Sequence, residues 1–107
     1  GGGNTIFDSS IHQHHGTFID GLSWLASENG SILDFDGTDD YIDITNHDDL
    51  DPKDHSFTIS FWFNTAISAI TKGNEMSILH SRHTTNGDIV RIYQSVSNDR
   101  LFFILNN

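Results

Sequence analysis

Residues 56–63 read Ser56-Phe57-Thr58-Ile59-Ser60-Phe61-Trp62-Phe63, an octapeptide with strict two-residue alternation. The three phenylalanines and the isoleucine occupy every second position, and serine, threonine and tryptophan lie between them. Because successive side chains of a β-strand point to opposite faces, this period of two directs one apolar face toward a core. The octapeptide therefore predicts a half-buried strand over Phe57–Asn64.

Further short apolar stretches, rich in aromatic and β-branched residues, recur between clusters of Gly, Asn, Asp and Ser. This pattern is typical of strands joined by turns, and Ser97-Asn98-Asp99 predicts one such hairpin turn. At most one helical turn is expected, within Ala66–Ile70. The predicted fold class is all-β, an antiparallel β-sandwich of the jelly-roll type. The other predicted strands are Gly16–Asp20, Ser31–Phe35, Tyr41–Ile44, Met76–Ser81, Ile89–Ser95 and Leu101–Leu105.

The composition is that of one small acidic domain. The chain has 107 residues, and we interpret residues 1–3 as a flexible linker ahead of a domain over residues 4–107. Fifteen Asp and Glu against five Lys and Arg give a net charge of -10, which disfavours phosphate contacts. Cysteine is absent, so thiolate chemistry is excluded. We therefore expect no nucleic-acid partner and, without a long apolar stretch, no membrane insertion.

The densest group of carboxylates surrounds Gly37, in the turn between two predicted strands. Carboxylate oxygens at a tight turn are ligands that Ca²⁺ prefers. The alternative is that Asp34 and its neighbours cap the turn by accepting backbone N–H bonds. We hypothesise a calcium site, for which the candidate metal residues are Asp36, Gly37, Asp39 and Asp40.

The segment Ile32–Ile44, which contains this turn, resembles a hallmark of bacterial and viral laminin G-like domains, members of the concanavalin A-like lectin and glucanase superfamily. Downstream, Phe57–Trp62 is similar to the first long core strand of that family. Upstream, the family's opening segment is matched at His15-Gly16-Thr17, Asp20-Gly21, Trp24 and Gly30. These three matches come in the family's order and cover about half of the chain.

The resemblance implies a two-layer β-sandwich with a structural calcium, and it adds Asp8 as a further ligand because Asp8 opens the family-like segment. Family members continue beyond the equivalent of Leu101–Leu105 with several closing strands that do not follow here. The chain is then a fragment, an abbreviated fold, or a unit that another copy or another chain completes. In each case the edge at Leu101–Leu105 is expected to pair with an available strand.

Histidine and tryptophan residues have simple explanations. Imidazoles at His12, His14 and His15 are ligands that zinc, copper and nickel prefer, but alternate spacing on an irregular segment fixes no geometry. No matching carboxylate is marked in the sequence, so a solvated loop is expected. Trp24 and Trp62 could stack on sugars, although packing between layers explains both, and for Trp62 we expect burial.

No catalytic constellation is visible, and the chain is predicted not to be an enzyme. Glycoside hydrolysis needs two carboxylates across a cleft, whereas Glu28 and Glu75 both fall in predicted loops. The first hypothesis is an extracellular binding or adhesion module on a cell or virion surface, which recognises glycan or protein and is stabilised by calcium. The alternative is a structural subunit of a fibre, filament or virion that assembles through strand edges. A truncated hydrolase is a third interpretation.

Overall fold

The computed structural model describes residues 3–52, 56–66, 68–83 and 87–106. Within those residues the chain is mostly β, with eight strands, one α-helix and one short 3-10 helix. All the strand pairs are antiparallel and form three small sheets. The chain divides into two compact units, Gly1–Leu50 (unit 1) and Asp51–Asn107 (unit 2). Unit 1 contains two of the sheets and unit 2 contains the third.

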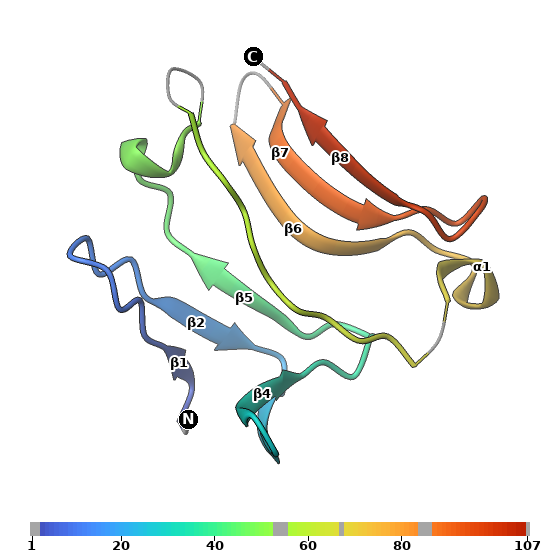
Figure 1. Ribbon diagram of the computed structural model, residues 1–107, viewed down its shortest axis with the longest axis horizontal. Coiled ribbons are helices and arrows are strands. Elements are labelled where there is room, and N and C mark those ends of the chain that lie inside the picture. The colour runs from blue at the N-terminus through green and yellow to red at the C-terminus, as the bar shows by residue number, and fades with distance from the viewer. Residues whose placement is uncertain (1–2, 53–55, 67, 84–86, 107) are drawn as a thin grey trace. The chain divides into compact units, whose positions relative to one another are not determined.

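The first sheet of unit 1 has the order β1-β2-β5. Its strands are β1 (Thr5–Ile6), β2 (Gly16–Ile19) and β5 (Tyr41–Ile44), and Figure 1 shows β2 and β5 side by side. Gly16 begins β2 and is buried between neighbouring isoleucines, which leave no space for a Cβ atom. A 3-10 helix, η1 (Asp48–Leu50), follows β5 and ends the unit.

The second sheet of unit 1 is a hairpin of β3 (Ser23–Ser27) and β4 (Gly30–Asp34). Its tight turn depends on Gly30, because a φ of 116° is a conformation that other residues rarely adopt. Trp24 pairs with Leu33 across the hairpin, and its ring lies 5.6 Å from the ring of Phe18 on β2. Half-buried Trp24 therefore packs against the first sheet of its own unit.

Unit 2 is built on a sheet of order β6-β7-β8, whose three strands lie side by side in Figure 1. The strands are β6 (Met76–His83), β7 (Gly87–Gln94) and β8 (Leu101–Leu105). Among the side chains of unit 2 that the structure describes, most of the buried apolar ones lie on the central strand β7, namely Ile89, Val90 and Ile92. Val90 and Ile92 have paired neighbours on both β6 and β8, which contributes to their burial.

A single turn of α-helix, α1 (Ala69–Lys72), precedes this sheet. The Ser68 side chain accepts the backbone N–H of Thr71 at the start of the helix, and Gly73 ends it with a φ of 77°. The predicted helical turn at Ala66–Ile70 overlaps α1 but begins three residues and ends two residues too early, and residue 67 lies outside the described residues. The turn exists because its two ends are capped.

The predicted strand at Phe57–Asn64 is wrong, since these residues are extended in Figure 1 but pair with no strand. The apolar face expected from the alternation does make contacts. Phe57 lies 6.4 Å from Phe103 of β8, ring to ring. The expected burial of Trp62 is also wrong, because its exposed fraction is 101%. Alternation thus indicated an extended backbone with one apolar side, but a strand also needs backbone hydrogen bonds to a neighbouring strand, and residues 57–64 are assigned none.

The prediction of antiparallel strands is confirmed at β2, β4, β5, β6, β7 and β8, all within a few residues of the predicted bounds. Strand β8 follows β7 through a turn containing Ser97-Asn98-Asp99, as predicted. The strands β1 and β3 were not predicted. No closed barrel forms among the described strands, and the two-layer sandwich and the single domain over residues 4–107 stay predictions.

Candidate functional site

Two groups of side chains in unit 1 bring three metal-ligating atoms within 4.8 Å of one another. The first, the aspartate bend, consists of Asp36, Asp39 and Asp40. The second, the histidine cluster, consists of His12, His14 and Asp49. Each could hold a metal ion, but their donor atoms differ: all oxygens in the bend, and two nitrogens with one carboxylate in the cluster.

The aspartate bend joins β4 to β5, and its backbone turns at Gly37, where φ is 74°. The carboxylate of Asp36 accepts the N–H of Thr38 at 2.7 Å, and that of Asp40 accepts the N–H of Asp36 at 2.9 Å. These two bonds are what aspartates at a turn provide without any ion. The structure thus brings Asp36, Asp39 and Asp40 together as predicted, around a bend they themselves stabilise.

One atom of the bend lacks a partner. The Oδ1 atom of Asp40 is buried and accepts no hydrogen bond from the described residues, although its Oδ2 atom does. A buried carboxylate oxygen without a donor costs free energy, because the water it bound in the unfolded chain is not replaced. A cation in contact with Oδ1 would compensate that cost.

Asp8 is not part of the aspartate bend and lies on the loop between β1 and β2. Its carboxylate accepts three hydrogen bonds, from the N–H and the hydroxyl of Ser10 and from the N–H of His14. These donors, led by the Ser10 hydroxyl, lower the pKa of Asp8 from 3.8 to about 2. The carboxylate of Asp8 therefore organises this loop.

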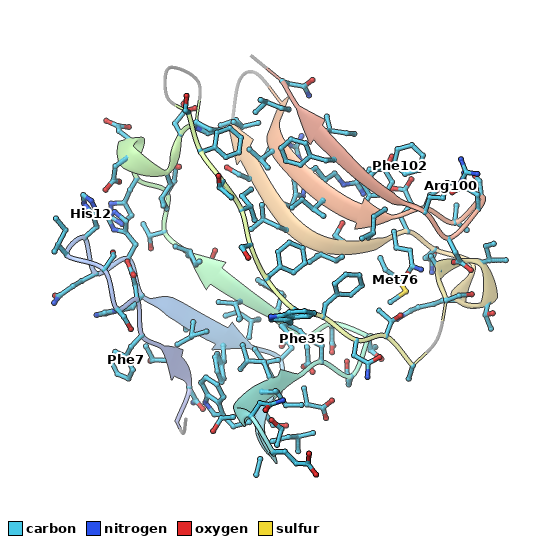
Figure 2. The ribbon with its side chains drawn as sticks, viewed as in Figure 1. Phe7, His12, Phe35, Met76, Arg100 and Phe102 are labelled. Carbon is cyan, nitrogen blue, oxygen red and sulfur yellow. The ribbon has the colours of Figure 1, made fainter. Side chains whose placement is uncertain are left out.

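The histidine cluster forms where that loop meets η1. The Nε2 atom of His14 lies 2.8 and 2.7 Å from the two carboxylate oxygens of Asp49, and the Nδ1 atom of His12 lies 3.0 Å from one of them. The hydrogen bond with His14 lowers the pKa of Asp49 below its usual value. His12 is labelled in Figure 2, on the loop between β1 and β2.

Local backbone geometry explains why alternate histidines converge. Gln13, between them, has a φ of 55°, a left-handed conformation that bends the chain, and Asp8 fixes the N–H of His14. The ring of His14 also stacks on the ring of His47, with centroids 3.7 Å apart. As a result the side chain of His14 is only 13% exposed. The loop holds His14 in one position before any ligand arrives.

His15, the third histidine of the sequence group, has a different role. Its Nδ1 atom accepts the backbone N–H of Asp8, and its ring meets the ring of Phe7 edge-on at 5.1 Å. Beside the cluster lies a hollow of about 440 Å³, lined by apolar Ile6 and Ile44 as well as by cluster residues. The cluster thus borders an open cavity.

Sequence reasoning missed Asp49, which supplies the carboxylate that the histidines were expected to lack. Asp49 and His14 are separated by 35 positions. The only local signal was the acidic run Asp48-Asp49, which begins four residues after the end of β5, the strand that pairs with β2. Because β2 and β5 are antiparallel, the segment before β2 and the segment after β5 meet at one end of the sheet.

Comparison of the chain with protein-family models, with curated proteins and with solved structures finds no match. Among the described residues, no helix has the length and apolar character needed to cross a bilayer. The two clusters and the sheets that carry them are therefore the observations from which a function can be argued.

Proposed function

We propose that this chain is a non-enzymatic extracellular recognition module whose aspartate bend binds Ca²⁺. The observation that carries the proposal is that Asp36, Asp39 and Asp40 each offer a carboxylate oxygen within 4.8 Å of the others, while Oδ1 of Asp40 is buried without a hydrogen-bond partner among the described residues. Ca²⁺ takes six to eight oxygen ligands in flexible geometry. Three carboxylates supply part of that number, and water or backbone carbonyls supply the rest.

A calcium ion at this bend would connect the two sheets of unit 1, because the bend lies between β4 and β5. Several aspartates close together repel one another, and a divalent cation removes that repulsion. The function of the ion in this proposal is to hold the loops of the module in one shape. Such rigid loops on a β scaffold are the usual carriers of recognition.

The exposed indole of Trp62 supports glycan as one class of ligand. Its exposed fraction of 101% leaves both faces open, and an aromatic face offers an apolar platform to a sugar ring. Protein is the other class of ligand for such a module, with the laminin G-like resemblance as its support. Substitution Trp62→Ala should abolish any binding seen on an array of immobilised glycans, while leaving calcium binding unchanged.

Thermal unfolding with and without calcium tests the metal part. At a calcium concentration about tenfold above Kd, mass action adds about 1.4 kcal/mol. For a chain of this size, that raises Tm by about 6 °C. Asp40→Asn should abolish the rise, and Asp34→Asn, outside the bend, should keep it. A Tm that neither millimolar calcium nor EDTA moves would rule out the calcium site.

The free edge of β8 favours a second candidate function, that of a structural subunit. Among the described strands, β8 pairs only with β7, so its other edge offers unpaired backbone groups. Its side chains Leu101, Phe103 and Leu105 are exposed. Edges of this kind add strands from other chains. A second copy of this chain is the partner we propose, and static light scattering across micromolar concentrations would show its mass increase.

A further inference from the structure

The histidine cluster has the donor set of a transition-metal site and not that of a calcium site. Imidazole nitrogens and a carboxylate suit Zn²⁺, whereas Ca²⁺ takes oxygen. Zinc sites that keep one coordination position open also have three protein ligands, and two His with one carboxylate is one of the known sets. This cluster shares no residue with the aspartate bend. The two clusters can therefore be tested independently.

The distances fit replacement of a proton by a metal ion. With zinc–ligand bonds of about 2.1 Å at tetrahedral angles, ligand atoms lie about 3.4 Å apart. The nitrogens of His14 and His12 lie 2.7 and 3.0 Å from the nearer oxygen of Asp49, as hydrogen-bonded atoms do. Small side-chain rotations would open these distances. A metal-binding ring nitrogen carries no proton, so any proton on it would pass to solvent or be exchanged for one on the other ring nitrogen as the metal–nitrogen bond forms.

The surroundings hold the ligands in place. Asp8 fixes the backbone of His14, and stacking on His47 fixes its ring. His12 lies parallel to His14, with ring centroids 5.8 Å apart and an interplanar angle of 21°. Preorganisation of this kind reduces the entropy lost when a ligand binds. Asp49 and His12 remain accessible to solvent, which leaves an entry path for an ion.

We propose that His12, His14 and Asp49 form a binding site for one divalent transition-metal ion, best suited to Zn²⁺. Three protein ligands leave the fourth tetrahedral position to water or to a group that enters the neighbouring hollow. His47 contributes through stacking and is not one of the three ligands.

Calorimetric titration of the full chain with zinc chloride tests the site, after EDTA treatment and removal of any histidine tag. The expected result is one ion per chain. Loss of a metal ligand should weaken binding by about tenfold or more, since even a lost second-shell partner costs that much. The variants are His12→Gln, His14→Gln and Asp49→Asn. The controls are His80→Gln on β6 and Asp40→Asn in the bend, both of which should keep the affinity of the unsubstituted chain.

Nuclear magnetic resonance of the histidine rings tests the site without any substitution, so its result does not depend on whether a variant folds. In the unsubstituted chain, one equivalent of zinc should shift the ring nitrogens of His12 and His14 and leave those of His80 in place. The proposal is overturned if Asp49→Asn binds zinc as tightly as the original chain, if the shifts fall on other histidines, or if no saturable binding occurs.

Discussion

At Gly16 the structure leaves no room for a side chain. A Cβ atom there would lie 2.5 Å from Cγ2 of Ile42 and 2.7 Å from Cγ2 of Ile6. Overpacking of this kind typically costs about 1–3 kcal/mol. We expect Gly16→Ala to lower the free energy of urea unfolding by that amount. Thr17→Ala, on the exposed side of the same strand, should change it by about 0.5 kcal/mol or less. Equal effects of the two substitutions would contradict the packing.

Asp8 makes the stability of unit 1 depend on pH in the acidic range. Its pKa is about 2 in the folded chain, against 3.8 for a free aspartate. A carboxylate whose pKa is lowered by folding contributes its full stabilisation above the unfolded pKa. That stabilisation is lost as the pH falls from about 4 through 2. We expect Asp8→Asn to be less stable than the original chain near neutral pH, with the difference shrinking over that interval. Urea unfolding in EDTA measures it. A difference that stays constant down to about pH 2 would exclude this role.

The two clusters differ in how far the residues alone could predict them. The aspartate bend was predictable because Asp36, Asp39 and Asp40 are close in sequence and a turn must bring them together. The histidine cluster was not, because Asp49 approaches His14 only through the pairing of β2 with β5. Local spacing determines the first site, and strand topology determines the second.

At the scale of elements, strands were predictable where turns bounded them. Tyr41–Ile44 and Leu101–Leu105 are flanked by Asp-rich and Asn-rich turns, and both bounds are correct. Strand β3 was missed because Ser23–Ser27 mixes polar and apolar residues without a clear period. Phe57–Asn64 shows the opposite error, in which a clear period lacks a pairing partner. Periodicity reports which side chains share a face, and it cannot report whether the backbone forms hydrogen bonds with a neighbouring strand.

Asp99 joins two elements of unit 2, the β7–β8 turn and α1. Its carboxylate accepts the N–H of Ile70 at 3.0 Å, and its φ of 56° is left-handed. We expect Asp99→Ala to lose the hydrogen bond and retain the strained φ, at a cost of about 1–2 kcal/mol. Asp99→Gly should lose the bond but relieve the φ, and so cost less. Thermal unfolding should therefore give Asp99→Gly a higher Tm than Asp99→Ala. If the hydrogen bond alone mattered, Asp99→Gly would have no such advantage.

At the scale of the whole molecule, apolar surface is incompletely buried. Among the described residues of unit 2, the buried apolar ones are Ala69, Ile89, Val90 and Ile92, whereas eleven large hydrophobic residues are exposed, Phe61 and Phe102 among them. Large exposed apolar side chains that gather in one patch usually mark an interaction surface. The two-layer sandwich predicted from the sequence would cover such a face, and so would a second copy.

Association of two copies through the free edge of β8 can be tested by substitution of one residue. Hydrogen bonds from Asn106 to Ile89 and from Ser95 to Arg100 fix the ladder between β7 and β8. In an antiparallel ladder, hydrogen-bonded and non-hydrogen-bonded pairs alternate along the strands. By this alternation, Phe103 and Ile92 form a non-hydrogen-bonded pair, so the N–H of Phe103 points away from β7. Proline at this position removes an outward donor without breaking the ladder.

We therefore expect Phe103→Pro to prevent edge-to-edge association that the unsubstituted chain shows in light scattering as its concentration rises. Phe103→Ala is the matched control, because it removes the same ring contact with Phe57 but keeps the N–H. It should still associate. If the chain stays monomeric at every concentration, or if both variants associate as the original does, β8 is not an assembly edge. Association lost equally in both variants would assign the contact to the Phe103 ring and not to the backbone.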